Sequence, residues 1–317
     1  MELRELGRAT FDGAALVRDH PPRFTLGHKR RLYEGIPESI GGTLTVSRWT
    51  GELPATVDLS AGRAPTLEVA RDQFTYPPDP PGATRWHANF ADTHLFFAYG
   101  GSLMAQDEIQ VMEHPVLGSL REALVAGTAG TPGLAPLARE RGAPTPVLVR
   151  GAQRSMAIDT AQGLYGNAFA RAPFDRIEAA TRYLDPPTLS NIVAIVAPVG
   201  GSGRYSHDEI ADILATASIG FGACRLESGD TTPMVHTGNW GTGAFGGNRV
   251  LMALLQLLAA RIAGVERIVF HSREGDAHLR EAQRVLNELP LTEAESTADL
   301  IDAVEARGFT WGVSDGN

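Results

Sequence analysis

The sequence predicts an α/β fold for most of the chain. After about residue 80, short apolar runs of the kind found in buried strands alternate with longer segments of helical periodicity. A strand, loop, helix and second strand at this spacing form a right-handed βαβ unit, so we expect helices on both faces of one sheet. The length of 317 residues is sufficient for one large domain or two small ones.

The first 75 residues have a different pattern. Short extended pieces, expected at residues 43–49 and 56–59, are separated by proline and glycine without a long helical period. The proline-rich run at residues 76–82 cannot form a helix or a central strand. We therefore expect an N-terminal accessory segment at residues 1–80, which covers a cleft or completes the sheet, and a main domain at residues 81–317.

The alternating part of the chain begins after this boundary. Apolar runs predict strands at residues 146–150, 191–198, 234–237 and 267–271. Helical periodicity predicts helices at residues 206–218, 248–263, 276–289 and 293–307. The first helix opens with a capping box, in which Ser206 accepts from a backbone amide and Glu209 reaches back. The second is almost wholly apolar, is interrupted by Gln256 and is stopped by Gly264.

The composition excludes several kinds of chemistry. Lys29 is the only lysine, which excludes a pyridoxal Schiff base or a P-loop lysine in the body of the fold. Cys224 is the only cysteine, so a disulfide framework, a cysteine-rich zinc site and an iron–sulfur cluster are excluded as well. The nine histidines show no recognised ligand spacing. We expect neither a metal site nor a cofactor.

The charge and hydropathy patterns favour a cytoplasmic protein. The formal net charge of −9 argues against general binding to nucleic acid or to an anionic membrane. Residues 1–8 are charged and lack the apolar core of a secretory signal. The longest apolar stretch, residues 250–258, is too short to span a bilayer.

A glycine-rich segment at residues 236–248 is the first candidate site. Its five glycines lie between an expected strand and the first turn of an apolar helix. Glycines there let backbone amides converge without Cβ obstruction, and the helix N-terminus adds partial positive charge. The segment predicts a phosphate or diphosphate cradle; the alternative is a tight structural loop enriched in glycine by GC-rich coding.

An acidic motif, Gln106-Asp107-Glu108, is the second candidate. It follows Gly100 and Gly101 after four residues and leads into an apolar helical pattern. Adjacent carboxylates on a helix point in different directions, so one can face a cleft while the other is solvated. Taken alone, the motif is better interpreted as a helix start enriched in acids.

Together the two motifs resemble the poly(ADP-ribose) glycohydrolase family. Residues 237–247, Thr-Gly-Asn-Trp-Gly-Thr-Gly-Ala-Phe-Gly-Gly, are similar to that family's phosphate loop, with threonine at 242 in place of cysteine. The two glycines and the acidic motif resemble its glycine triplet and Gln-Glu-Glu signature. Residues 89–92, Asn-Phe-Ala-Asp, resemble its Asp-Phe-Ala-Asn. The resemblance spans roughly residues 84 to 275.

The resemblance implies a macrodomain-like mixed sheet flanked by helices, and a glycoside hydrolase that cleaves a ribose–ribose or related ADP-ribosyl bond. Glu108 is implied as the catalytic acid/base, with Asp107 beside it in the catalytic pair and positioning the ribose. The partner is ADP-ribose or an ADP-ribosylated macromolecule, without metal or cofactor. The implied substrate-binding residues are Gln106, Asn89, Asp92, Gly100, Gly101, Asn239, Gly241, Thr242, Gly243, Ala244, Phe245, Gly246 and Tyr165, the last as a candidate for stacking on adenine.

Departures from the family pattern keep two alternatives open. The gap between the glycines and the acidic motif is four residues instead of six or more, and Asp107 is one methylene shorter than the family's glutamate. One alternative is a module that binds ADP-ribose without hydrolysis. The other is an N-glycosidase that acts on a mono-ADP-ribosyl or nucleotide substrate.

Overall fold

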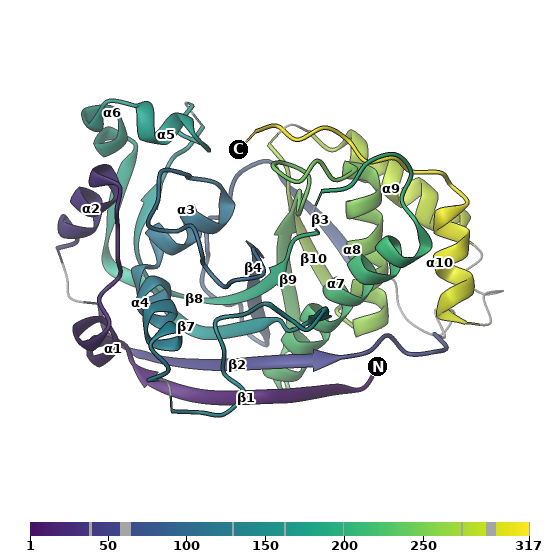
Figure 1. Ribbon diagram of the computed structural model, residues 1–317, viewed down its shortest axis with the longest axis horizontal. Coiled ribbons are helices and arrows are strands. Elements are labelled where there is room, and N and C mark those ends of the chain that lie inside the picture. The colour runs from purple at the N-terminus through teal and green to yellow at the C-terminus, as the bar shows by residue number, and fades with distance from the viewer. Residues whose placement is uncertain are drawn as a thin grey trace.

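The described part of the chain forms one eight-stranded mixed sheet with helices on both faces (Figure 1). This computed structural model describes residues 1–37, 40–57, 65–128, 130–161, 163–198, 200–273, 275–289 and 296–316. The predicted α/β fold class, a mixed sheet flanked by helices, is confirmed. The strands lie in the order β1 (Leu3–Asp12), β2 (Thr43–Gly51), β7 (Val147–Ile158), β8 (Thr181–Val196), β4 (Ala83–Ala91), β9 (Thr232–Gly238), β10 (Arg267–His271) and β3 (Thr66–Ala70). A separate two-stranded sheet joins β5 (Arg139–Glu140) to β6 (Ala143–Pro144).

The large sheet has an antiparallel half and a parallel half. β1, β2, β7 and β8 pair antiparallel. From β8 through β4, β9 and β10 to β3, every neighbouring pair is parallel. Because parallel strands end on the same side, the loops that follow β3, β4, β9 and β10 converge at one edge of the sheet.

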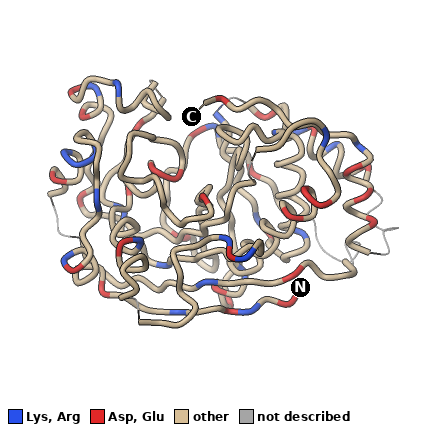
Figure 2. Tube along the Cα trace, in the orientation of Figure 1, with Lys and Arg blue, Asp and Glu red and all other residues tan. Residues whose placement is uncertain are grey.

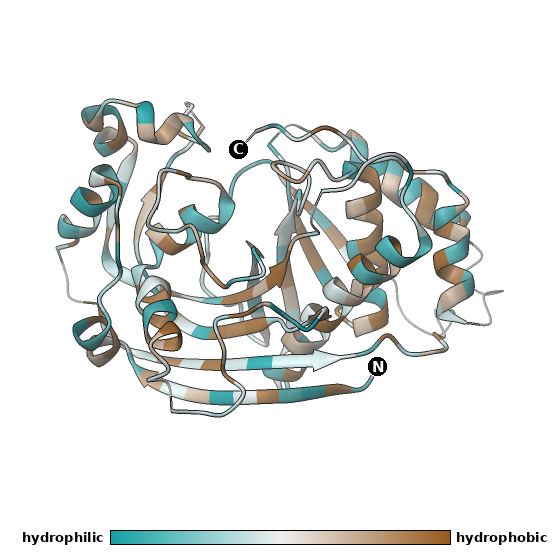
Figure 3. Cartoon of the chain, viewed as in Figure 1, coloured by the Kyte–Doolittle hydropathy of each residue, from teal (hydrophilic) through white to brown (hydrophobic). Residues whose placement is uncertain are grey.

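The helices divide into two groups. In Figure 1, α1 to α6 lie on the left and α7 to α10 on the right. Figure 3 shows α8 mostly brown, as expected of a helix buried all round, and α2 mainly teal. The helices are α1 (Gly13–Asp19), α2 (Gly27–Glu34), α3 (Gln106–Glu113), α4 (Pro115–Val125), α5 (Ala168–Arg171), α6 (Phe174–Ala179), α7 (His207–Ser228), α8 (Arg249–Ala263), α9 (Ala277–Glu288) and α10 (Thr297–Glu305).

Two hydrophobic cores lie on opposite faces of the sheet. Along β8, Val193 and Ile195 point into the core beneath α7 and α8, whereas Ile192 and Val196 point into the core beneath α1 to α4. Burial on both faces explains why residues 191–198 form a continuous apolar run instead of an alternating one.

The strands and helices predicted after the boundary are present, and three of them extend well beyond the predicted ends. β7 continues eight residues past 150, and β8 begins ten residues before 191. α7 continues ten residues beyond the expected end at 218, through Gly220 and Gly222. These glycines permit close packing: a Cβ at Gly220 would lie 2.4 Å from the Cγ2 atom of Ile195, and one at Gly222 would lie 2.4 Å from Met1. Residues 293–295 of the last predicted helix lie outside the described residues, and α10 covers the part that follows.

Strands from both sides of the expected domain boundary share the large sheet. β1, β2 and β3 precede residue 80, and β2 and β3 pair with strands that follow it. The division at residue 80 therefore stays a prediction. Of the extended piece expected at residues 56–59, Thr56 and Val57 lie in a loop, and residues 58 and 59 fall outside the described residues. No helix in the described ranges has the length and apolar character needed to cross a membrane.

Candidate active site

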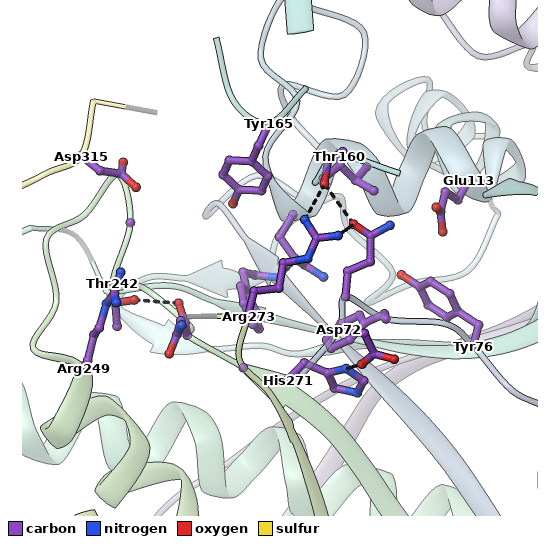
Figure 4. A pocket seen from close by; sticks show the side chains of 18 residues that line it. Asp72, Tyr76, Glu113, Thr160, Tyr165, Thr242, Arg249, His271, Arg273 and Asp315 are labelled. Atoms are coloured by element: carbon purple, nitrogen blue, oxygen red, sulfur yellow. Dashed lines mark hydrogen bonds and ion pairs between the residues drawn. The ribbon is translucent and has the colours of Figure 1, made fainter. Parts of the chain in front are cut away.

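A cavity of about 400 Å³ opens where the parallel strands end (Figure 4). Loops that follow β3, β9 and β10 contribute to its wall, together with Phe90 of β4, α3 and the segment after β7. This is the place where open α/β sheets bind ligands. The lining residues are Asp72, Gln73, Phe74, Tyr76, Phe90, Gln106, Ile109, Glu113, Thr160, Tyr165, Gly238, Asn239, Thr242, Gly243, Arg249, His271, Arg273 and Asp315.

The glycine-rich segment forms one wall, between β9 and α8. Gly241 and Gly246 have φ angles of +70° and +65°, which side chains other than glycine rarely tolerate. The Gly247 amide donates to the Gly241 carbonyl at 2.9 Å, which folds the loop back on itself. Asn248 then caps α8 by accepting from two amides of its first turn. The loop therefore delivers Asn239, Thr242 and Gly243 to the cavity next to a helix N-terminus.

Gln256, the polar interruption in the apolar helix α8, fixes the start of this loop. Its side chain is fully buried. Its Oε1 atom accepts from the Thr237 hydroxyl at 2.5 Å, and its Nε2 atom donates to the Gly238 carbonyl at 3.2 Å. A buried amide with these partners ties the end of β9 to the helix, so the loop starts from a rigid position.

The acidic motif forms the first turn of α3 against the end of β4. The Gln106 side chain accepts from the Phe90 amide at 2.8 Å and donates to the Ala88 carbonyl at 2.9 Å. These two bonds lock the start of α3 onto the strand. Gln106 also lines the cavity, so the motif and the glycine-rich segment border the same space.

Both carboxyl groups of the motif are buried. The Asp107 Oδ1 atom accepts from Asn89 Nδ2 at 2.8 Å. The Glu108 Oε2 atom accepts from the Ala105 amide at 2.9 Å, which caps the helix. Asp107 and Glu108 are 8% and 3% exposed, so neither belongs to the solvated face that a plain helix start would present.

Burial alters the titration of both groups. It raises the pKa of Asp107 above its ordinary value, with a further contribution from the charge of Glu108. Burial also raises the pKa of Glu108, and the positive charge of Lys29 opposes that rise. A carboxyl group with a raised pKa holds its proton closer to neutral pH, which is what a general acid requires.

The end of the cavity away from Thr242 and Arg249 holds a chain of polar contacts (Figure 4). Asp72 Oδ1 lies 3.1 Å from His271 Nδ1, and His271 Nε2 lies 3.0 Å from His236 Nδ1. Burial lowers the pKa of His236 to about 3, so this imidazole is neutral. Arg273 donates to Gln73 at 2.8 Å. This end therefore offers mixed polar and aromatic surface, with Asp72 supplying a carboxylate.

Five of the residues predicted for the site line the cavity: Gln106, Tyr165, Asn239, Thr242 and Gly243. Asn89, Asp107 and Glu108 are buried and do not line the cavity in the described chain, although Asp107 and Glu108 directly follow Gln106 in α3. Gly241 and Gly246 shape the loop from its far side, where a Cβ at Gly241 would lie 2.7 Å from Pro198.

The remaining predicted residues lie elsewhere around the two motifs. Phe245 packs against the core beneath α8, and Ala244 is exposed. The Asp92 carboxylate is half exposed and accepts from the His94 amide. Gly100 faces the N-terminal segment, because its carbonyl accepts from the Thr25 and Leu26 amides; Gly101 follows it in the same loop. The binding roles of all these residues stay predictions.

Several lining residues were not predicted from the sequence. His271 is the last residue of the predicted strand at residues 267–271, and Arg273 follows it closely. Asp72 and Phe74 follow a strand that the sequence analysis did not identify. The signal for the first pair was their place at the end of a buried parallel strand, where ligand-binding residues gather. The second pair had no such signal, because β3 is only five residues long and half exposed.

Comparison with known proteins matched part of the chain to a family model. Residues 164–280 match the sequence model of a family described as poly(ADP-ribose) glycohydrolase, macro domain fold. The poly(ADP-ribose) glycohydrolase of Thermomonospora curvata is similar at 16% identity, with 94% of this chain and 99% of that chain covered and a TM-score of 0.45. The enzyme of Deinococcus radiodurans in complex with ADP-ribose is similar at 16% identity, with 87% and 97% covered and a TM-score of 0.44.

The family match contains β9, the glycine-rich loop, α8 and Tyr165, and it ends before α10. The acidic motif lies outside the matched residues, so its place beside the loop rests on the contacts described above. The chain thus resembles the poly(ADP-ribose) glycohydrolase family, as its two motifs predicted.

Proposed function

We propose that this protein hydrolyses an ADP-ribosyl bond and releases ADP-ribose, with Glu108 as the acid/base. One observation carries the proposal: the acidic motif and the glycine-rich loop, far apart in the sequence, border a single cavity. That cavity has about 400 Å³ of space, within the usual range of small-molecule sites. The family match over residues 164–280 supports ADP-ribose as the ligand.

The chemistry assigns the two motifs different tasks. The loop and the N-terminus of α8 bind the diphosphate, whose negative charge backbone amides and the helix dipole stabilise. Glu108 gives its proton to the oxygen that leaves the anomeric carbon of the ribose. The resulting carboxylate then takes a proton from the water that attacks this carbon, which restores Glu108 and yields ADP-ribose and a free hydroxyl.

The test is release of ADP-ribose from poly- and mono-ADP-ribosylated substrates by wild type, Glu108→Gln and Glu108→Asp. Glu108→Gln keeps an oxygen that can accept from the Ala105 amide but cannot transfer a proton, so kcat should fall by about 10²–10⁴-fold. Glu108→Asp keeps the carboxyl group and should retain part of the activity. Equal rates for wild type and Glu108→Gln would contradict the role of Glu108. The two substrate types decide between polymer and single ADP-ribosyl units.

A second candidate is a module that binds ADP-ribose without cleaving it. The observation that favours it is the position of Glu108, whose carboxylate is occupied as the cap of α3 and does not line the cavity in the described chain. Calorimetry with ADP-ribose beside the hydrolysis assay separates the two. Binding without turnover supports the module, and turnover supports the hydrolase.

We also propose a cytoplasmic protein without general affinity for nucleic acid. Figure 2 shows basic and acidic residues interspersed over the outer helices, whereas a nucleic-acid surface gathers basic residues on one side. A filter-binding assay with unmodified DNA and RNA tests this. Retention at physiological salt would contradict it.

A further inference from the structure

The only lysine of the chain is buried inside the fold. Lys29 belongs to the first turn of α2 and is 0% exposed. A positive charge near the N-terminus of a helix is disfavoured by the helix dipole, and burial adds a desolvation cost. Local helix stability therefore does not explain a lysine at this position, and its contacts must.

The Lys29 side chain holds the loop that leads into the acidic motif. Its Nζ atom donates to the Tyr99 carbonyl at 2.7 Å and to the Leu103 carbonyl at 2.5 Å. The two carbonyls lie on either side of Gly100 and Gly101, in the loop that leads to α3. A single ammonium group thus connects both sides of the glycine pair to the N-terminal segment.

Hydrogen bonds between uncharged groups hold the same loop. The Thr25 amide and hydroxyl both donate to the Gly100 carbonyl at 2.8 Å. The Arg23 amide donates to the Tyr99 hydroxyl at 2.6 Å. The N-terminal segment therefore holds the loop through several hydrogen bonds. Among these donors, Lys29 is the one that uses a charged side chain.

The charge of Lys29 acts on the acidic motif. It lowers the pKa of both Asp107 and Glu108, against the larger effect of burial. In return, burial lowers the pKa of Lys29 to about 8, while the charges of Glu108 and Asp107 oppose that fall. The three groups share one buried region of low dielectric, where charges interact more strongly than in water.

We propose that Lys29 is a positioning residue for the hydrolytic reaction: it ties the loop before α3 to the N-terminal segment and supplies the positive charge that balances the Asp107 and Glu108 carboxyl groups. The inference rests on the proposed role of Glu108. It gives residues 1–80 a task in the site, although none of the first 71 residues lines the cavity in the described chain.

The first experiment uses the single lysine as its own probe. Protein labelled with ¹³C at the lysine Cε, with no lysine in any tag, gives one lysine resonance. We expect this resonance to titrate with a pKa of about 8, because Lys29 is buried. In Glu108→Gln the midpoint should fall further, because a balancing negative charge has been removed. A midpoint near 10.5, the ordinary value, or an identical midpoint in the two proteins would overturn the proposal.

This titration does not depend on turnover. A shifted midpoint in a protein that releases no ADP-ribose would keep the charge balance and reject the hydrolase. An unshifted midpoint in a protein that releases ADP-ribose would keep the hydrolase and reject the charge balance. Because wild type and Glu108→Gln both retain Lys29, the result stands even if Lys29 variants fail to fold.

The second experiment compares pH–rate profiles of Lys29→Met, Lys29→Arg and Thr25→Val. Loss of the charge raises the pKa of Glu108, so the alkaline limb of kcat/KM should move to higher pH by about 0.5 unit or more in Lys29→Met. Lys29→Arg should keep the limb close to that of wild type. Thr25→Val removes an uncharged contact to the same loop and is the matched control. The same shift in Thr25→Val, or no shift in Lys29→Met, would overturn the electrostatic role.

Discussion

The glycine-rich loop and the acidic motif border one cavity but are held there by different means. The loop is shaped by its own backbone: two positive φ angles, an internal hydrogen bond between Gly247 and Gly241, and a cap at Asn248. The acidic motif depends on distant partners, because Gln106 bonds to β4 and Lys29 of α2 holds the preceding loop.

This difference decides what a sequence can reveal. A loop whose geometry is local carries its signature in adjacent residues, mainly glycines. A buried carboxyl group obtains its chemistry from burial and from charges far away in the chain, which no short motif records. The comparison predicts that substitutions near the acidic motif act through tertiary contacts, and those in the loop through backbone conformation.

The largest effect on stability is expected at Gly100. A Cβ there would lie 2.1 Å from the Arg23 carbonyl oxygen, a backbone atom of a residue whose amide bonds to the Tyr99 hydroxyl. Gly100→Ala should therefore lower the free energy of unfolding by about 3 kcal/mol and reduce activity, because the loop before α3 must shift. Urea denaturation of the purified variant measures the loss.

Gly101→Ala is the matched control for this substitution. Its Cβ would meet only the Ala98 carbonyl oxygen within 4 Å, at 3.4 Å, which is an ordinary contact. We expect a change within about 0.5 kcal/mol, since alanine also restricts the unfolded chain. Equal losses at both positions would show that the Arg23 contact does not hold the loop.

The strands of the parallel half differ in how clearly the sequence predicted them. Buried apolar runs identified β8, β9 and β10, because parallel strands covered on both faces are apolar throughout. β4 is equally central, between β8 and β9, yet it was missed as a strand. Its Thr84, His87 and Asn89 are buried polar residues that interrupt the apolar pattern.

The candidate site was only partly accessible from the sequence. Asn239, Thr242 and Gly243 were predicted from their motif and line the cavity. The Asp72 to His271 contact joins residues 199 positions apart, so only the sheet order brings it together. The length of α7 was underestimated because Gly220 and Gly222 normally weaken a helix, whereas here they allow close packing.

An intermediate effect is expected in the glycine-rich loop. Within the loop, Gly241 has a φ angle of +70° and does not line the cavity. A Cβ at this position would lie 2.7 Å from Pro198. Gly241→Ala should lower the free energy of unfolding by about 1–2 kcal/mol. Gly243 lines the cavity, and the nearest atom to its Cβ would be the Asp315 carboxylate at 3.1 Å, on a side chain that can move.

Gly241→Ala and Gly243→Ala should therefore separate an effect on stability from an effect on ligand binding. Gly243→Ala should leave the unfolding transition almost unchanged and weaken ADP-ribose binding by about tenfold, because a methyl group then occupies space next to the diphosphate. Differential scanning fluorimetry and calorimetry with ADP-ribose provide the two measurements. Unaltered affinity in Gly243→Ala would argue against the loop as the diphosphate site.

The smallest effect concerns the pH dependence of stability, and it tests the acidic motif alone. Burial raises the pKa of Asp107 in the folded protein above its ordinary value of 3.8, so the folded state binds the proton more tightly. The unfolded state therefore binds fewer protons above about pH 4, and the free energy of unfolding decreases as pH rises from there. Glu108 acts in the same direction, because burial raises its pKa as well.

Asp107→Asn removes the loss of stability that accompanies ionisation of a buried carboxyl group. The asparagine keeps an oxygen that can accept from Asn89. It should match wild type near pH 4 and be more stable near pH 8 by about 1 kcal/mol or more, a rise in Tm of about 2 °C or more. Asp230→Asn, which alters an exposed carboxylate in the turn before β9, is the control and should leave the slope of stability against pH unchanged. Parallel curves for wild type and Asp107→Asn would mean that Asp107 ionises in the folded state much as it does in water. The raised pKa would then belong to Glu108 alone, and the balance of charge around Lys29 would involve a single carboxyl group.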